Sequence, residues 1–241
     1  MKNTSIAVVM NVQWEDINTM SLTPHWISPS QHNTPYNPKV IVQDDFMDAS
    51  YCDFVCDSMG ANFFTWFPWY YGQIIPYNSN TDNHCQEICA PEHNHQFSNR
   101  LYELNVDTSE YFHLVKPLVD NINPDVLFKV KANLGTQYPK RIVHGYHTDL
   151  FVLGCTSVFY LNDNDGATMF KWKDDTTGEE RYEEVQSKKG RLVTFDNRTL
   201  HSGTTTTDSP YRLVINLNYY KHDYFHENSW WLLQRTIRHL R

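Results

Sequence analysis

A short stretch in the second half of the chain decides the fold. It reads Cys155-Thr156-Ser157-Val158-Phe159-Tyr160-Leu161-Asn162-Asp163-Asn164-Asp165-Gly166-Ala167-Thr168-Met169-Phe170-Lys171-Trp172. Both ends are rich in β-branched and aromatic residues, which favour strands. The central Asn, Asp and Gly residues favour a turn, because they tolerate left-handed backbone angles and bond to the nearby backbone. The stretch therefore predicts two neighbouring strands, Cys155 to Asn162 and Ala167 to Trp172.

Short β-rich runs separated by turn residues continue on both sides of this stretch. Eight such runs in succession fit a double-sheet jelly roll, the cupin-like barrel that is also called a double-stranded β-helix. The predicted fold class is mainly β, with flanking α-helices. The expected strands are Val126 to Leu134, Arg141 to Asp149, Cys155 to Asn162, Ala167 to Trp172, Arg181 to Val185, Arg191 to Phe195, Thr199 to Thr204 and Tyr211 to Tyr220.

Composition divides the chain into three parts that we expect to form one structural domain. Residues 1–125, dense in Pro, Asn and aromatic side chains, predict a helical and loop-rich support region. Residues 126–220 contain the eight expected strands and predict the jelly-roll core, where we expect any catalytic residues to lie. Residues 221–241 predict a C-terminal amphipathic helix, with apolar side chains on one side between Trp230 and Leu240.

Three local signals stand out in the support region. Ile41 and Val42 predict a short strand. Asp48 to Ser50 predicts the N-terminal cap of a helix over Tyr51 to Met59, because Ser and Asp side chains accept bonds from the first free N–H groups. Asp107 to Glu110 resembles the capping signal of a second helix that runs through Val119.

Length and composition describe an ordinary globular chain. Its 241 residues are 40% hydrophobic, enough for a substantial core, and no apolar run approaches the roughly 18 residues of a spanning helix. The five cysteines are an odd number without the pattern of a disulfide framework, and no signal segment follows Lys2. We therefore expect free thiols, a cytoplasmic location and no membrane partner.

The formal net charge of −8 is unevenly distributed. Residues 1–125 contain 4 basic and 15 acidic side chains, whereas residues 126–241 contain 16 and 13. A polyanion would be repelled by the first half. The charge pattern therefore argues against duplex nucleic acid as a partner and leaves a small molecule or a peptide as the expected substrate.

Two histidines and a carboxylate form the candidate metal site. His147 and Asp149 lie two residues apart in an expected strand, so their side chains point to the same face. His201 lies in the seventh expected strand, which neighbours the second at the mouth of a jelly roll. Two histidines and one carboxylate are the ligand set that leaves positions open on non-haem Fe(II).

Arg212 in the last expected strand is the second chemical signal. It shares a face with Val214 and Asn216 in a strand that is otherwise apolar. A guanidinium pointing into an apolar barrel is costly without an anion to pair with it. A dicarboxylate cosubstrate would supply that anion.

These residues together resemble the 2-oxoglutarate and Fe(II)-dependent dioxygenases of the prolyl-4-hydroxylase type, and in particular the small members found in marine and T4-like phages. The segments that carry the resemblance cover most of residues 126–220. They are Lys129 to Leu134, His144 to Asp149, Phe159 to Gly166, Gly190 to Asp196, and His201 through Arg212.

The resemblance implies a role for each matched residue. His147, Asp149 and His201 would hold Fe(II), and Arg212 would bind the distal carboxylate of 2-oxoglutarate. Tyr160 and Asn216 would add hydrogen bonds to that carboxylate.

The implied activity is hydroxylation of an unactivated C–H bond with release of succinate and CO2. It would use O2 and 2-oxoglutarate as cosubstrates, with ascorbate as a stimulant. A phage origin would place the enzyme in the host cytoplasm.

Two alternatives stay open. One is a non-catalytic jelly-roll binding module, and the other is a cupin-type metalloenzyme without a keto-acid cosubstrate. A binding module has no reason to keep the three ligands and Arg212 together, and Arg212 argues against the second alternative.

Three further features have a structural and a functional interpretation. The group His84, Cys85, Cys89, His93 and His95 lacks zinc-finger spacing, yet a second metal site there stays open. The charged run from Lys171 to Arg191 predicts a solvated hairpin, with a mobile lid as the functional option. The aromatic run from Phe63 to Tyr71 predicts core packing. The functional option is that Trp66, Trp69 and Tyr70, within the acidic first half of the chain, form a second wall of the site that would suit an amine-bearing metabolite or an exposed peptide.

Overall fold

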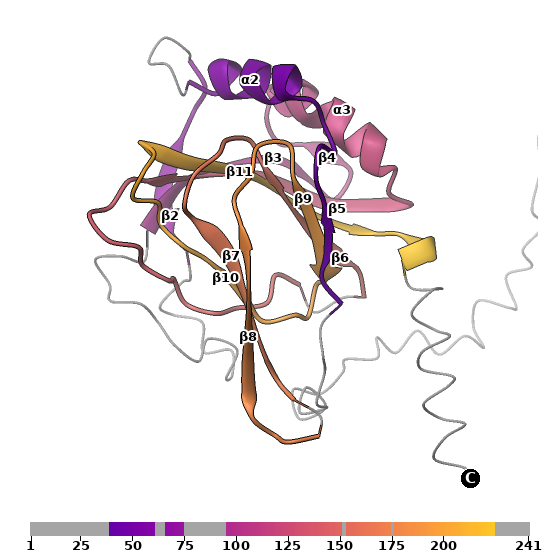
Figure 1. Cartoon of the computed structure of the whole chain (residues 1–241). Coiled ribbons are helices and arrows are strands. Elements are labelled where there is room, and N and C mark those ends of the chain that lie inside the picture. Colours follow the sequence, from indigo (N-terminus) through magenta and orange to yellow (C-terminus); the bar gives the residue numbers. More distant parts are fainter. Residues whose placement is uncertain (1–38, 61–65, 75–94, 151–152, 175, 225–241) are drawn as a thin grey trace, which may run out of the picture. The chain divides into compact units, whose positions relative to one another are not determined.

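The computed structural model describes residues 39–60, 66–74, 95–150, 153–174 and 176–224 (Figure 1). The chain divides into two units, residues 1–34 and 35–241, and every described residue belongs to the second. The expected helix from Trp230 to Leu240 and the cluster members from His84 to His93 lie outside the described residues. No helix within the described ranges is long and apolar enough to cross a membrane.

Most strands form one antiparallel sheet (Figure 1). Its members are β1 (Ile41–Gln43), β2 (Tyr70–Gln73), β3 (His95–Glu103), β4 (Val106–Asp107), β5 (Val126–Thr136), β6 (Cys155–Tyr160), β9 (Leu192–Asp196) and β11 (Tyr211–Tyr220). In the described part of the chain the order is β1-β9-β6-β11-β5-β3-β2, and β4 pairs with β3. The sheet therefore continues across residue 125, where the composition changes.

A smaller sheet faces the first. It contains β7 (Ala167–Lys173), β8 (Glu180–Gln186) and β10 (His201–Gly203) in the order β10-β7-β8. Apolar side chains from both sheets, among them Val158, Phe170, Phe195 and Val214, pack together as an inner core. This arrangement confirms the predicted jelly roll. Seven of the eight expected strands are present among the described residues, with ends shifted by up to two positions.

Two helices, α2 (Ala49–Ser58) and α3 (Phe112–Ile122), lie over the outer face of the main sheet (Figure 1). The predicted cap of α2 is confirmed, because the Asp48 carboxylate accepts from the Tyr51 N–H at 2.7 Å. The second predicted helix is present as α3, and the Ser109 hydroxyl accepts from the Tyr111 N–H at 3.3 Å just before it, but the rest of the expected capping signal does not cap the helix. Val106–Asp107 forms β4 instead, and Tyr111 precedes the helix without a side-chain cap bond. Strand pairing with β3 has overridden the local signal.

The strand expected from Arg141 to Asp149 is also absent as a continuous element. This segment runs beside β10 and Thr204, with isolated bridges of Val143 to Thr204 and His147 to His201 and a hydrogen bond from the His144 N–H to the Gly203 carbonyl between them. Before Val143, the Ile142 N–H donates to the Thr205 hydroxyl rather than to a backbone carbonyl. The segment still lies beside β10, as the predicted adjacency required.

The first half of the chain contains one long strand that the sequence analysis did not expect. β3 pairs with β5 over most of its length, with a register shift between Arg100 and Tyr102. Its pairing extends the inner surface of the barrel beyond the eight expected strands.

Candidate metal centre

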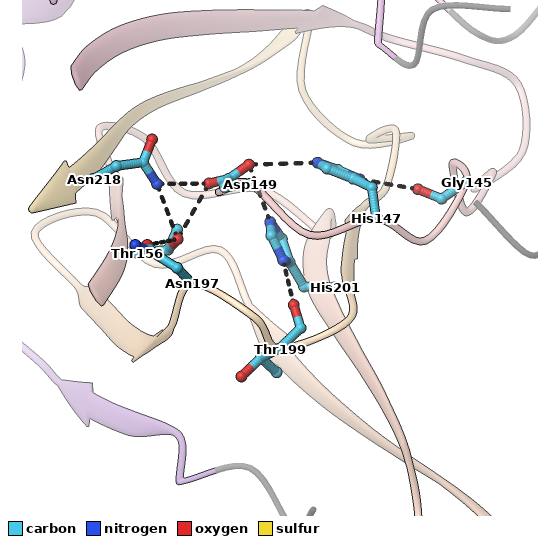
Figure 2. Close-up of polar contacts among 8 residues, drawn as sticks. All are labelled: Gly145, His147, Asp149, Thr156, Asn197, Thr199, His201 and Asn218. Atoms are coloured by element: carbon cyan, nitrogen blue, oxygen red, sulfur yellow. Dashed lines mark hydrogen bonds and ion pairs between the residues drawn. The ribbon is translucent and has the colours of Figure 1, made fainter. Parts of the chain in front are cut away.

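His147, Asp149 and His201 meet at the mouth of the barrel (Figure 2). Reciprocal backbone bonds join His147 and His201, with N···O distances of 2.9 and 3.0 Å. The ligand atoms of the three side chains lie within 4.8 Å of one another. Asp149 Oδ1 is 3.7 Å from His147 Nε2 and 3.8 Å from His201 Nε2.

A backbone carbonyl oxygen orients each of the two imidazoles. His147 Nδ1 lies 3.2 Å from the Gly145 carbonyl oxygen, and His201 Nδ1 lies 3.0 Å from that of Thr199. A carbonyl only accepts, so each Nδ1 donates and each Nε2 keeps its lone pair. Burial lowers the pKa of His147 to about 4, which keeps this imidazole neutral at neutral pH, as a metal ligand must be.

Asp149 is oriented through its other carboxylate oxygen. Oδ2 accepts hydrogen bonds from the Thr156 hydroxyl at 3.2 Å and from the Asn218 amide at 3.0 Å, while Asn197 lies 2.9 Å from the same hydroxyl (Figure 2). Burial opposes ionisation, but the two histidines, which become charged at acidic pH, together with Lys129 and the Asn218 hydrogen bond outweigh it and hold the pKa of Asp149 well below its usual range. The carboxylate is therefore charged, with Oδ1 left for an ion.

The sequence analysis missed these supporting residues. Asn218 shares the face of β11 with Arg212 and Asn216, so the alternation of polar residues in that strand was an available signal. Thr156 and Asn197 carried no comparable signal, since an isolated Thr or Asn is common in any strand or turn.

The donor set fits a divalent transition metal. Two neutral imidazole nitrogens and one carboxylate oxygen converge from one side, each fixed by a bond on its far side. Such a facial set suits Fe(II) and leaves the remaining positions for other ligands.

A cavity of about 400 Å³ adjoins the three residues. It lies between the inner faces of the two sheets. Its polar and charged lining, besides the three side chains themselves, includes Gln96, Lys129, Lys131, Asn133, His144, Thr148, Thr168, Thr204, Arg212 and Asn216.

Arg212 is buried in the wall of this cavity, with 9% of its surface exposed. Nε donates to the Ser187 hydroxyl at 3.0 Å and Nη2 to the Thr168 hydroxyl at 3.2 Å. No carboxylate pairs with it in the described ranges, and burial lowers the pKa of this guanidinium. A buried cation without a counter-ion is unfavourable, so the site fits an anionic ligand.

Tyr160 lies against this arginine, with the guanidinium 5.4 Å from its ring centroid. Its hydroxyl donates to Thr168 at 2.6 Å, and desolvation raises the pKa of the phenol, which therefore stays protonated. Asn216 lines the same cavity farther along β11, in register with Lys131. It is four residues from Arg212, about 13 Å along the strand.

The described part of the aromatic run packs into the core only in part, since Trp66, Tyr70 and Tyr71 are exposed. Phe67 is buried, and the Trp69 indole donates to the Met59 carbonyl at 2.9 Å. Trp66 is 92% exposed, and neither tryptophan lines the cavity beside the three candidate ligands. His95, the described member of the His/Cys cluster, lies 3.0 Å from the Tyr138 hydroxyl.

The other two expectations concern the charged run and the cysteines. The run from Lys171 to Arg191 contains the β7–β8 hairpin, and β8 is mostly exposed. Cys52, Cys56 and Cys155 are buried free thiols.

Comparison with known proteins finds relatives through structure alone. No family profile and no curated sequence matches the chain. Among solved structures, it is similar to the non-heme alpha ketoglutarate dependent epimerase SnoN from nogalamycin biosynthesis, at 13% identity over 76% of this chain and 77% of that chain, with a TM-score of 0.51.

Two further solved structures agree. SnoN in complex with Fe3+, alpha ketoglutarate and nogalamycin RO matches at 14% identity over 76% of this chain and 79% of that chain, with a TM-score of 0.50. An oxidoreductase of the 2OG-Fe(II) oxygenase family from Burkholderia pseudomallei matches at 13% identity over 76% and 86%, also with a TM-score of 0.50. These structural neighbours are 2-oxoglutarate/Fe(II) oxygenases, and the chain shares their jelly-roll fold.

Proposed function

We propose that the protein is an Fe(II)- and 2-oxoglutarate-dependent oxygenase that hydroxylates an unactivated C–H bond. The observation that carries this proposal is the presence, in one cavity, of a two-histidine, one-carboxylate set and a buried arginine without a counter-ion. The first fits the metal, and the second fits a carboxylate of the cosubstrate.

His147, Asp149 and His201 would hold the metal through Nε2, Oδ1 and Nε2. When bound, Fe(II) supplies the oxidising chemistry with O2, in which 2-oxoglutarate loses CO2 and becomes succinate while one oxygen atom enters the substrate C–H bond. The task of the chain is to hold the ligand atoms, orient the cosubstrate and exclude water.

Arg212 would bind the distal carboxylate of 2-oxoglutarate. Its guanidinium is oriented by Ser187 and Thr168, which leaves donor positions toward the cavity. Tyr160, which lies over the same guanidinium, would add a hydroxyl contact. Because Asn216 is four residues farther along β11 than Arg212, we assign it to the substrate side of the cavity rather than to this carboxylate.

Two observations weigh against the alternative functions. A non-catalytic jelly-roll module does not require two imidazoles whose Nε2 lone pairs point toward a charged, buried carboxylate. In a cupin-type metalloenzyme without a keto acid, Arg212 would have no anion to pair with. A buried cation without a counter-ion destabilises the fold.

The decisive experiment is succinate formation from 2-oxoglutarate with Fe(II), ascorbate and O2, measured by mass spectrometry with and without a host-like lysate. We expect succinate in the complete reaction and none without O2 or Fe(II). Products in the lysate heavier by one oxygen atom would support hydroxylation, whereas succinate without such products would support the oxygenase chemistry but contradict hydroxylation. Absence of succinate under every condition would contradict the proposal.

A further inference from the structure

Strand β5 places two lysines in the wall of the candidate active-site cavity. Lys129 and Lys131 line the cavity, whereas the intervening Val130 and the following Ala132 are fully buried in the core beneath the helices. Alternation along the strand therefore directs the lysine side chains to the inner face. A barrel interior needs no lysine for packing.

Neither lysine has a counter-ion in the described part of the chain. No ion pair joins either ammonium to a carboxylate there, and Asp149 is the acidic side chain on which Lys129 acts. Lys131 also lies opposite Arg100 of β3, a like-charged pair that weakens the sheet. Burial, Lys129 and Arg100 together lower the pKa of Lys131. Lys129 lies opposite Glu103, but the carboxylate of Glu103 pairs with Arg100.

The charge of the cavity stays positive when the enzyme is loaded. Among the described lining residues there are three cations, Lys129, Lys131 and Arg212, and one carboxylate, Asp149. Not counting the histidines, of which the two candidate ligands must be uncharged to bind a metal, this leaves two positive charges. Fe(II) adds two and 2-oxoglutarate removes two, so the loaded cavity has the same excess and attracts an anion.

Asn133 supplies an independent sign of a ligand. It is 8% exposed, lines the same cavity two residues beyond Lys131, and its Oδ1 is a buried acceptor without a hydrogen-bond partner. Buried acceptors are nearly always satisfied in folded proteins. A bound molecule with an N–H or O–H group beside its anionic group would satisfy it.

We propose that Lys129 and Lys131 bind an anionic group of a small-molecule substrate, a carboxylate or a phosphate, while Asn133 accepts a hydrogen bond from it. This inference rests on the proposed oxygenase function and names its substrate class. It replaces the expectation of an amine-bearing substrate, because Trp66, Trp69 and Tyr70 do not line this cavity whereas the two lysines do.

The binding test uses two simple anions as probes. Protein loaded with redox-inert Mn(II) and saturating 2-oxoglutarate is melted with inorganic phosphate or acetate at constant ionic strength. We expect the melting temperature of wild type to rise with one of the probes, which identifies the anion class, and the Lys129→Met/Lys131→Met variant to lose at least about ten-fold in apparent affinity. The single variant Lys131→Gln provides the same comparison if the double variant does not fold.

Lys116→Met is the matched control, because Lys116 is exposed on α3 and pairs with Asp120. It should respond to both probes like wild type. Equal responses of wild type and the lysine variants would overturn the inference. Succinate formation by wild type tests the oxygenase function separately, so the two failures are distinguishable.

A second test uses substrate-triggered turnover with matched compounds. Adenosine monophosphate is compared with adenosine, N-acetylglycine with its amide, and putrescine serves as the amine. We expect the anionic member of at least one pair to raise succinate formation. Greater stimulation by putrescine or by the neutral members would overturn the inference.

Discussion

Strand β11 has two faces that are equally enclosed but chemically opposite. Toward the helices it presents Leu213, Ile215 and Leu217, which pack into the outer core. Toward the cavity it presents Arg212, Asn216 and Asn218. Strand β5 repeats the contrast with its alternating apolar and basic residues.

The contrast separates stability from function. Apolar contacts on the outer face stabilise the fold without directional demands. Burial of the polar residues on the inner face is unfavourable unless each has a partner. The charge of Arg212 has no counter-ion among the described residues, and Asn133 Oδ1 accepts no hydrogen bond there. Such departures from apolar packing are expected where a protein binds a ligand.

Removal of a candidate metal ligand should have the largest effect on activity. In His147→Ala, Asp149→Ala or His201→Ala we expect succinate formation to disappear and Mn(II) affinity to fall by at least about 100-fold, because two ligands cannot define the site. The outer core is untouched, so the circular dichroism spectrum should stay that of wild type. Calorimetric titration with Mn(II) measures the effect.

The exposed His113 on α3 provides the control for these variants. His113→Ala should bind Mn(II) like wild type. Unchanged affinity in any one of the three ligand variants would remove that residue from the site.

Arg212→Leu should come next. We expect the binding free energy of 2-oxoglutarate to weaken by about 2 to 5 kcal/mol, because a buried, charge-assisted contact loses one partner. The ligand-free variant should melt higher than wild type, since an unpaired buried charge has been removed. Arg212→Lys should lose less affinity. Titration of the Mn(II)-loaded protein with 2-oxoglutarate measures the loss of affinity, and melting curves measure the gain in stability. Equal affinity in wild type and Arg212→Leu would show that 2-oxoglutarate is bound by another residue.

Ile215→Ala tests the opposite face of the same strand. Ile215 is fully buried in the outer core, so its truncation should lower the free energy of unfolding by about 2 to 5 kcal/mol. The folded variant should bind 2-oxoglutarate with wild-type affinity. Urea denaturation and the same titration provide the two numbers. A loss of affinity as large as that of Arg212→Leu would show that the two faces are not separable.

Asn218→Ala should have a smaller effect, confined to the metal site. Loss of its amide bond to Asp149 Oδ2 frees the carboxylate to rotate, and we expect Mn(II) affinity to fall by about 10- to 100-fold. The matched control is Ser157→Ala, which removes a buried hydroxyl bonded to Thr194 and Tyr219. Both variants should lose stability, but only Asn218→Ala should weaken Mn(II) binding; equal metal affinities would reduce Asn218 to a structural role.

The smallest effect concerns an exposed ion pair at the edge of the sheet. Hydrogen bonds from Arg191 and Lys188 lower the pKa of Asp44 to about 2. A lowered carboxyl pKa contributes stability that is present above the ordinary value near 4 and is lost as the pH falls toward 2. Asp44→Asn should therefore show a shallower fall of melting temperature between about pH 4 and pH 2. Asp45→Asn is the neighbouring control and should follow wild type.

Local sequence determined the elements of this fold. Alternating β-rich runs and Asn, Asp and Gly turns predicted seven of the strands present among the described residues, and Asp48 predicted the start of α2. These signals act over a few residues, through backbone preferences and the exclusion of apolar side chains from water. They can therefore be recognised in the sequence without knowledge of tertiary contacts. Where two local signals competed, as when a hairpin with β3 took up Asp107 at the start of the expected α3 cap, the prediction failed.

The partners of the site were decided by tertiary structure. Asn218 reaches Asp149 from 69 residues away, and Thr168 reaches Arg212 from 44. The sequence predicted that His147, Asp149 and His201 meet, but not that the segment carrying the first two joins β10 through isolated bridges and single hydrogen bonds rather than a continuous ladder. Nor did it predict that Lys129 and Lys131 face the same cavity as Arg212. Packing of the two sheets against each other brings these groups together. Hydrogen bonds and interactions between charges depend on distances in space, which spacing along the chain does not specify.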